Sequence, residues 1–260
     1  MNISSALSSI ERQNQILQLI VRSSRITLSE VCETFSVSQA TARRDLEALA
    51  SQGKVQRVHG GAITIHQANP EPPILLRSSE QEEEKRRIGQ LAASLILDGE
   101  VVFLGSSTTV LEVAKNLRER RELTVLTNSL PVMNIFAGIP EITLVCLGGV
   151  LRSSELSFIG HITEKSLTEV RADKVVFGTR ALSLEHGLTN DYLPETLTDR
   201  AILGMGGQVI IVADYSKFGR VSTAFLAPLS AMHTLVTDSK APVEYLSALA
   251  KQGIRVLVAR

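Results

Sequence analysis

Two short amphipathic segments separated by only two residues restrict what the first part of the chain can fold into. Leu28, Val31 and Phe35 are spaced i, i+3 and i+7, which places them on one face of a helix. The dipeptide Ser36-Val37 leaves room for only a tight turn before the next helical segment. Two short helices joined by such a turn are typical of a helix-turn-helix.

Capping residues mark the ends of these predicted helices. Thr27 with Glu30 three residues later has the spacing of a capping box. Ser38 is a favourable N-cap for the next helix, which we expect to reach about Gln52 and to stop at Gly53. Residues 11–22 are predicted to form an earlier helix, because their apolar side chains fall on one face.

The helix that starts at Ser38 has one apolar and one polar face. Ala42, Leu46 and Leu49 share the face that should pack inward. The opposite face offers hydroxyl and guanidinium groups at its N-terminal half, where a recognition helix meets base edges and phosphates. The run Arg43-Arg44-Asp45 has a second interpretation, a solvated face with local ion pairs.

A predicted hairpin follows this helix directly. Residues 54–58 and 62–65 have the pattern of strands, and His59-Gly60-Gly61 suits the turn between them. A hairpin in this position is a wing, whose basic residues lie near a flanking phosphate or the minor groove. We therefore predict DNA contacts from Thr27, Ser38, Gln39, Ala40, Thr41, Arg43, Arg44, Lys54, Arg57 and His59.

The motifs S-V-S-Q-A-T-A-R-R-D-L and R-V-H-G-G-A resemble the DeoR family of bacterial transcriptional regulators. Ala42 stands where the family usually has a larger aliphatic side chain. The resemblance implies a winged helix-turn-helix, with its helix-turn-helix over about residues 26–45, that binds double-stranded operator DNA. The family pattern is matched at Thr41, Arg43, Arg44, Asp45, Leu46, His59, Gly60, Gly61 and Ala62.

The net charge does not by itself indicate DNA binding. The chain has 27 basic and 27 acidic residues, so its formal net charge is zero. Residues 1–66 have only a small excess of basic side chains. Specific local contacts must therefore supply the affinity for DNA.

Three features of the sequence indicate a cytoplasmic protein. Cys32 and Cys146 lie in apolar-periodic segments, and we interpret both as reduced core residues. No apolar run reaches the length of a membrane span. The N-terminus does not have the pattern of a signal peptide.

Prolines mark a predicted linker over residues 67–77, between a domain of residues 1–66 and one of residues 78–260. Pro70, Pro72 and Pro73 cannot continue a helix. Ser78 or Ser79 is then expected to cap a helix, and we interpret its run of acidic and then basic residues as a solvated face.

The rest of the chain alternates between apolar strand segments and helices. This alternation predicts an α/β fold with a mainly parallel sheet covered on both faces. The expected strands lie near residues 101–104, 123–126, 142–147, 174–177, 209–213, 222–226, 233–237 and 254–258.

Polar loops follow several of these strands. The segment 105–109 reads Gly-Ser-Ser-Thr-Thr and leads into a helix, whose N-terminal N–H groups suit a phosphate. Polar residues also follow the strands that end near residues 126, 147 and 213, with Arg152 and Lys217 as cations. Ligands bind at the carboxyl ends of parallel strands, so the loops together predict an anion pocket. Each loop alone has a structural alternative, such as a helix cap or a solvated turn.

The motifs G-S-S-T-T, L-G-G-V-L-R and D-Y-S-K-F-G are similar to the effector domain of the DeoR family, which is related to ribose-5-phosphate isomerase. The resemblance implies that the ligand is a phosphorylated sugar. Gly105, Asp199 and the segment 179–181 depart from the family pattern, and Arg180 is an alternative cation. The effector contacts that we expect are Gly105, Ser106, Ser107, Thr108, Thr109, Asn128, Ser129, Gly148, Gly149, Arg152, Glu195, Arg200 and Lys217.

The two domains together predict a homo-oligomeric transcriptional regulator, a repressor of a sugar or carbohydrate catabolic operon, with no cofactor or metal. The alternative is a sugar-phosphate isomerase or deaminase-like enzyme with an attached DNA-binding module. Against it, the Asp-Gly-Ala-Asp segment of the isomerases is missing, and Glu195 alone does not make a general base. The glycines at 204–207 would have to follow a strand to bind a dinucleotide, and we interpret them as a helix end.

Overall fold

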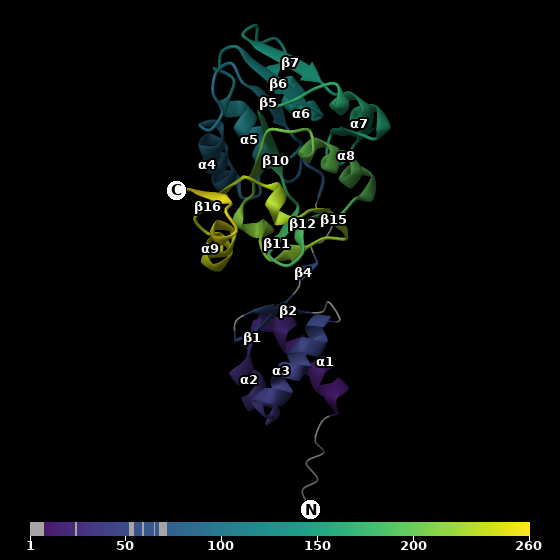
Figure 1. Ribbon diagram of the computed structural model, residues 1–260, viewed down its shortest axis with the longest axis vertical. Helices are drawn as coiled ribbons and strands as arrows, with labels where there is room; N and C mark the ends of the chain where they lie inside the picture. Colours follow the sequence, from purple (N-terminus) through teal and green to yellow (C-terminus); the bar gives the residue numbers. More distant parts are fainter. Residues whose placement is uncertain (1–7, 24, 52–54, 59, 65, 68–71) are drawn as a thin grey trace, which may run out of the picture. The chain divides into compact units, whose positions relative to one another are not determined.

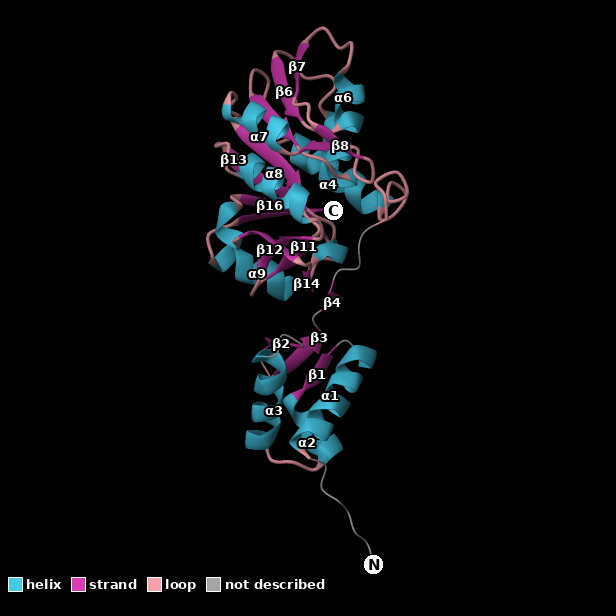
Figure 2. Cartoon of the chain, turned by 90° about the vertical axis from the view of Figure 1, so that its right-hand side faces the viewer, coloured by secondary structure: helices cyan, strands magenta, loops and turns pink. Residues whose placement is uncertain are grey.

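The computed structural model describes residues 8–23, 25–51, 55–58, 60–64, 66–67 and 72–260. The chain divides into two compact units, Met1–His66 and Gln67–Arg260, and each is described by itself. Figures 1 and 2 show the helices and strands of both units.

The first unit packs three helices against a small antiparallel sheet with the strand order β1-β3-β2. Its core contains Ile16 and Ile20 of the first helix with Val31, Leu46 and Leu49 of the next two, all buried. The predicted helix-turn-helix is therefore confirmed, whereas the first strand was not predicted. The elements are α1 (Ser9–Ser23), β1 (Arg25–Thr27), α2 (Leu28–Phe35), α3 (Gln39–Ser51), β2 (Val55–Val58) and β3 (Gly61–Thr64), followed by β4 (His66–Gln67) at the boundary.

The two wing glycines have different physical roles. Gly60 has a φ of +84°, a conformation that costs little only for glycine and a few polar residues. At Gly61 the reason is close approach, because an added Cβ would lie 2.1 Å from the carbonyl oxygen of Ile26 on the neighbouring strand β1. The pair thus makes the turn and lets the third strand of this sheet form.

The second unit is built on a seven-stranded parallel sheet with the order β17-β16-β13-β10-β5-β6-β7. The predicted α/β fold is confirmed. The sheet strands are β5 (Val101–Leu104), β6 (Leu123–Thr127), β7 (Ile142–Cys146), β10 (Lys174–Gly178), β13 (Gln208–Val212), β16 (Thr234–Asp238) and β17 (Arg255–Ala259). The helices are α4 (Glu82–Ala93), α5 (Thr108–Asn116), α6 (Leu130–Phe136), α7 (His161–Thr168), α8 (Leu193–Leu203) and α9 (Val243–Lys251), with the 3-10 turns η1 (Tyr215–Lys217) and η2 (Leu229–Ala231).

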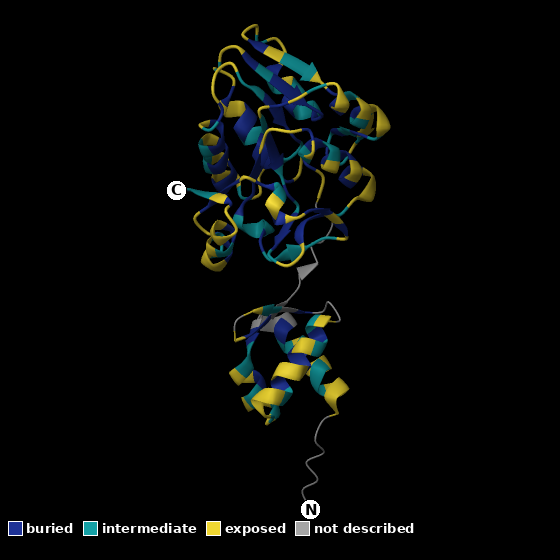
Figure 3. Ribbon diagram, viewed as in Figure 1, coloured by how far each residue is buried: buried dark blue, intermediate teal, exposed yellow. Residues whose placement is uncertain are grey.

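Both faces of this sheet are buried, which explains its continuous apolar strands. Phe103 of β5 packs in the cluster formed with α7, α8 and α9, whereas its neighbours Val102 and Leu104 pack in the cluster formed with α4, α5 and α6. Figure 3 shows the strands of the sheet as largely buried and the outer faces of the helices as exposed.

Short antiparallel strands lie outside the main sheet. One three-stranded sheet has the order β11-β12-β15, and β8 pairs with β9 in a hairpin. The strand expected near residues 222–226 belongs to this smaller sheet. The bounds are β8 (Val150–Arg152), β9 (Ser157–Ile159), β11 (Ala181–Ser183), β12 (Gly187–Asn190), β14 (Arg220–Val221) and β15 (Ala224–Ala227).

The predicted start of α4 is wrong. The helix begins at Glu82 after Gln81, which has a left-handed backbone, so neither Ser78 nor Ser79 caps it. Its charged run is also not wholly solvated, because Glu84 and Lys85 are buried. Glu84 pairs with Lys240, and the Lys85 Nζ donates to the carbonyl oxygen of Arg77 at 2.8 Å.

The prediction that Cys146 is a core residue is also wrong. Cys146 is the last residue of the edge strand β7 and its side chain is exposed, because the end of an edge strand has fewer neighbours to cover it. Cys32 is half-buried, and both thiols are free.

In the part of the chain that the structure describes, no helix is long and apolar enough to cross a membrane.

Candidate functional site

The N-terminal half of α3 presents polar side chains to solvent. Ser38, Gln39, Arg43 and Arg44 are exposed, and Ala40 lies between them on the same surface. Among the described residues, neither Arg43 nor Arg44 makes an ion pair. Thr41 is half-buried, and its backbone N–H donates to the Ser38 hydroxyl at 3.3 Å, so Ser38 also caps the helix. The two guanidiniums are therefore available to a ligand.

Asp45 does not pair with its arginine neighbours. It is buried, and its carboxylate accepts a hydrogen bond from the Arg12 Nε at 2.6 Å and one from the Gln13 Nε2 at 3.0 Å. Hydrogen bonds to a charged group stabilise more than neutral ones. Asp45 thus ties α3 to α1, and the interpretation of the charged run as locally paired does not hold for this residue.

The remaining predicted DNA contacts have different surroundings. The Thr27 hydroxyl and the Glu30 side chain form the predicted capping box, with the Thr27 N–H donating to Glu30 at 2.6 Å. The Arg57 Nη1 donates to the carbonyl oxygen of Gly61 at 3.1 Å, within the hairpin. Lys54 and His59 lie outside the described residues.

A polar pocket lies at the carboxyl ends of β5, β6 and β10 in the second unit. Ser107 is one of its half-buried lining residues, and a Cβ added to Gly178 would come within 2.4 Å of the Ser107 hydroxyl, so glycine there makes room for this side chain. The pocket is lined by Arg77, Ser106, Ser107, Asn128, Glu155, Phe177, Gly178, Thr179, Arg180, Asn190, Glu195, Asp199 and Leu226.

The serines at the end of β5 lead into the N-terminus of α5. The Ser107 hydroxyl accepts from the Val110 N–H at 3.0 Å, and Ser106 donates to the carbonyl oxygen of Glu155 at 3.0 Å. Thr108 and Thr109 are buried in the first turn of the helix. This end of α5 carries the positive end of the helix dipole and N–H groups that suit an anion.

Asn128, after β6, has one free polar atom at the pocket. Its Nδ2 donates to the carbonyl oxygen of Phe158 at 2.9 Å, whereas its buried Oδ1 has no hydrogen-bond partner among the described residues. Leaving a buried acceptor unpaired costs free energy. A ligand hydroxyl at this place would satisfy it.

Three arginines and several carboxylates surround the pocket. Glu155 is buried between Arg77, whose Nη2 lies 2.5 Å from one carboxylate oxygen, and Arg180, whose Nη2 lies 2.7 Å from the other. Arg152 pairs with Glu195, and Asp191 lies 3.3 Å from the Arg180 Nε. The positive charges are thus held in place by carboxylates before any ligand enters.

Two acidic residues of α8 are buried at the same pocket. Burial raises the pKa of Glu195, although Arg152 and a hydrogen bond from Ser157 oppose the shift. Burial, and the nearby charge of Glu195, raise the pKa of Asp199 well above its usual value. The Asn190 Nδ2 donates to the Asp199 carboxylate at 2.6 Å. In both acids the shift is toward the protonated form, and a protonated carboxyl group donates as well as accepts hydrogen bonds.

The structure brings only some of the predicted effector residues together. Ser106, Ser107, Asn128 and Glu195 line the pocket, and Arg152 reaches it through Glu195. Gly105 lies behind it, because a Cβ there would meet the Phe177 ring at 2.9 Å.

The others lie among neighbouring packing contacts. The carbonyl oxygen of Gly148 accepts from the Thr163 hydroxyl at 2.8 Å, and Gly149 packs against the same side chain. Ser129 is buried at the start of α6, and Arg200 donates to the carbonyl oxygens of Phe225 and Leu226.

Lys217 does not lie among the lining residues of the pocket. It ends η1, which Asp214 precedes. Burial lowers the pKa of the Lys85 ammonium group; the charge of Asp214 opposes this shift and the charge of Lys217 adds to it. The Lys217 contact with an effector stays a prediction.

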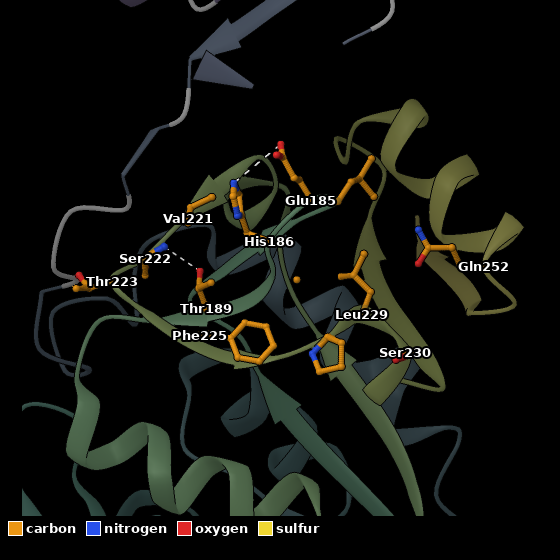
Figure 4. A pocket seen from close by; sticks show the side chains of 13 residues that line it. Glu185, His186, Thr189, Val221, Ser222, Thr223, Phe225, Leu229, Ser230 and Gln252 are labelled. Atoms are coloured by element: carbon orange, nitrogen blue, oxygen red, sulfur yellow. Dashed lines mark hydrogen bonds and ion pairs between the residues drawn. The ribbon is translucent and has the colours of Figure 1, made fainter. Parts of the chain in front are cut away.

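A second, open groove of about 590 Å³ was not predicted (Figure 4). Its wall includes the turn between β11 and β12, with His186 and Glu185 4.0 Å apart, and the exposed ring of Phe225. None of the residues predicted to bind DNA or effector lines it.

Both units match models of known protein families. The model described as "DeoR-like helix-turn-helix domain" matches residues 12–68, and the model described as "DeoR C terminal sensor domain" matches residues 80–239. The chain belongs to the DeoR family. The resemblance found in the motifs is thereby confirmed, and with it a DNA-binding transcriptional regulator and not an enzyme.

Named DeoR-type relatives match along nearly the whole chain. The "HTH-type transcriptional repressor GlcR" of Bacillus subtilis is 35% identical, over 95% of this chain and 95% of its own length. The "Glycerol-3-phosphate regulon repressor" of Escherichia coli is 32% identical, over 95% of this chain and 97% of its own.

Solved structures match the chain more distantly. Ribose 5 phosphate isomerase A from Neisseria gonorrhoeae is 15% identical with a TM-score of 0.40, over 54% of this chain and 55% of that chain. At this score the likeness supports no conclusion about activity.

Sequence reasoning missed several residues of the pocket of this DeoR-family chain. Arg77 precedes the region matched by the sensor-domain model, and Glu155 lies in the turn between β8 and β9, where no periodic pattern marks it. Arg180 was considered only as an alternative cation. A signal for Asp199 existed, because an acidic residue on the inward face of α8 must be buried next to a polar partner.

Proposed function

We propose that this DeoR-family regulator is a repressor of a carbohydrate operon and that a phosphorylated sugar bound in the pocket of the second unit sets its affinity for DNA. The observation that carries the proposal is the pocket itself, with the N-terminus of α5 at Ser107 and three arginines beside acidic and amide groups.

The two kinds of polar group fit the two halves of such a ligand. Arginine side chains and helix N-terminal N–H groups bind phosphate oxygens. Carboxyl and amide groups of Glu195, Asp199 and Asn128 suit sugar hydroxyls, which both donate and accept. A phosphorylated sugar presents both chemistries in one small molecule.

The printed names of the relatives support the same ligand class. The relative from Escherichia coli is named for the glycerol-3-phosphate regulon, and GlcR is named as a transcriptional repressor. By analogy we infer repression for this chain, with a small phosphorylated carbohydrate or polyol as effector.

The DNA-binding unit should work as two copies. A single recognition helix makes few base contacts, and helix-turn-helix proteins commonly bind two half-sites as dimers. The first unit has only a small excess of positive charge, so one copy gains little from bulk electrostatics. We infer a homo-oligomer that acts in the cytoplasm, where its operator lies.

The test is a thermal-shift screen of the full chain with ribose 5-phosphate, glucose 6-phosphate, fructose 6-phosphate and glycerol 3-phosphate, each against its unphosphorylated form. A compound at about 100 times its Kd stabilises the folded state by about 2.7 kcal/mol, which raises the melting temperature measurably. We expect at least one phosphorylated compound to do so and its unphosphorylated form not to.

Two matched variants locate the binding. Asn128→Asp places a negative charge in the pocket and should abolish the shift, whereas Asn116→Asp makes the same change on the exposed face of α5 and should not. If no phosphorylated compound shifts the wild type, or if Asn128→Asp responds like the wild type, the proposed effector site is wrong.

A further inference from the structure

The segment that leads into the second unit is anchored at the pocket. The Ile74 N–H donates to the carbonyl oxygen of Ser154 at 2.8 Å, and the Ile74 side chain is buried. Its neighbours Leu75 and Leu76 are exposed. One apolar side chain and one backbone hydrogen bond therefore fix this segment beside the turn that carries Glu155.

Arg77 is the polar part of this anchor. Its side chain is 7% exposed, and its Nε donates to the carbonyl oxygen of Pro72 at 2.8 Å. Its Nη2 lies 2.5 Å from the carboxylate of Glu155, and its own carbonyl oxygen accepts from the Lys85 Nζ. The same guanidinium thus holds the segment 72–77 in a closed loop and lines the effector pocket.

An anion in this pocket would change the surroundings of Arg77. Glu155 is the carboxylate that Arg77 and Arg180 share, and a phosphate close to it would place two negative charges together. A guanidinium binds phosphate in the same two-pronged geometry as a carboxylate. Arg77 can therefore exchange Glu155 for phosphate by a small movement of its side chain.

We propose that Arg77 binds the anionic group of the effector and that its exchange between Glu155 and this group transmits effector binding to the segment 72–77. The proposal rests on the proposed function above, because it needs an anionic effector in this pocket. Residue 77 follows His66, the last residue of the first unit, by eleven positions, so a change here acts on the chain that leads to the DNA-binding unit. An effector can shift DNA affinity only through contacts that differ between two states, and the Arg77 exchange is such a contact.

If Arg77 exchanges partners in this way, two substitutions should change the affinity for the effector in opposite directions. Arg77→Ala removes a charged hydrogen-bond donor and should weaken binding about 10- to 100-fold. Glu155→Gln keeps the shape but removes the competing charge, and should tighten binding. If the Arg77–Glu155 ion pair only stabilised the fold, both variants should lose stability and Glu155→Gln should not bind the effector more tightly. Arg86→Ala, an exposed arginine of α4, is the matched control.

The experiment measures the Kd of the full-length chain by calorimetry for the compound of the four-member phosphorylated panel that stabilises the wild type most. Hydrogen exchange of residues 72–81 is followed with and without that compound. We expect altered exchange of this segment in the wild type and in Arg86→Ala, weakened binding without the exchange response in Arg77→Ala, and tighter binding in Glu155→Gln.

Four results would overturn the proposal. Wild-type affinity in a folded Arg77→Ala, or unchanged exchange of residues 72–81 on saturation of the wild type, would leave the effector pocket standing but exclude Arg77 as its link to the segment. If Arg77→Ala does not fold, failure of Glu155→Gln to bind the effector more tightly would likewise exclude Arg77 as this link. If no panel compound binds the wild type, the proposed function fails as well.

Discussion

Arg43, Arg44 and Asp45 are neighbours in the sequence but have separate roles. The Asp45 carboxylate is buried against Arg12 of α1, so it is not available to neutralise the two exposed guanidiniums. The orientation of α3 thus depends on the same tripeptide that supplies its cations.

We predict that Arg43→Ala and Arg44→Ala each weaken binding to DNA without unfolding the first unit. A guanidinium that contacts a base contributes about 1–3 kcal/mol, and loss of one that contacts a phosphate lowers the salt dependence of binding. Fluorescence anisotropy with a DNA duplex selected by the full chain from a random pool measures both effects. Wild-type affinity of both variants at moderate salt would contradict the recognition surface, and Arg86→Ala serves as the control.

The buried acid Asp199 predicts a pH dependence of stability. Its raised pKa means that the folded state binds this proton more tightly than the unfolded chain does. The free energy of unfolding therefore falls as pH rises above about 4, the usual range of a carboxyl group. Asp199→Asn mimics the protonated form, so it should become more stable than the wild type as pH increases to about 7, and should lose this advantage near pH 4.

Thermal melts across this range check the pH prediction. Asp98→Asn, an exposed acid of the same unit, is the control and should show no such trend. A difference between Asp199→Asn and wild type that is constant with pH would mean that the pKa of Asp199 is the same in the folded and unfolded states.

The residues of the pocket differ in how far local sequence could predict them. Ser107, Asn128 and Glu195 carry a local signal, because they are polar residues at strand ends or match a family motif. Arg77 and Glu155 carry none, because they meet across 78 positions of the chain and their pairing depends on the complete fold. The periodicity of the sequence can locate the loops of the pocket, but it cannot predict the ion pairs between them.

The same limit applies to whole elements. The seven strands of the main sheet were predictable, because each is a mainly apolar run; the inner strands are largely buried, and the edge strands β7 and β17 are less so. Strand β1 was not, because it has only three residues and forms by pairing with the distant wing strand β3. The start of α4 was misplaced because residues 73–81 form turns held by Arg77, which no capping rule describes.

Substitutions of the wing glycines test whether pairing with β3 holds β1 in place. Gly61→Ala would place its Cβ against backbone atoms of Ile26 and Thr27, which cannot move without breaking the strand pairing. We expect a loss of about 1–3 kcal/mol in the stability of the first unit and weaker DNA binding. Gly60→Asn is the control, since open space surrounds this position and asparagine tolerates its left-handed backbone.

Hydrogen exchange of the β1 and β3 amides separates these two variants. Gly61→Ala should lose protection in both strands, and Gly60→Asn should keep it. Equal protection in the two variants would show that the close approach of Gly61 to Ile26 does not hold the sheet together.

The whole molecule joins a DNA-binding unit with a small excess of positive charge to a larger unit whose pocket holds paired charges. Neither the DNA-binding unit nor the pocket alone gives control of DNA binding by an effector. An effector must bind the two DNA-affinity states differently, and a coupling of about 1–3 kcal/mol is sufficient for control. The pocket, with its arginines already paired to carboxylates, offers such a difference, because an anion replaces one set of partners by another.

Effector control of DNA binding is tested by the affinity of the full chain for its selected DNA duplex, measured with and without a saturating phosphorylated panel compound. We predict that the compound which stabilises the second unit changes the Kd for DNA by about 5- to 150-fold, and that Asn128→Asp abolishes the change while Asn116→Asp keeps it. An unchanged Kd for DNA while the compound demonstrably occupies the pocket would contradict this prediction.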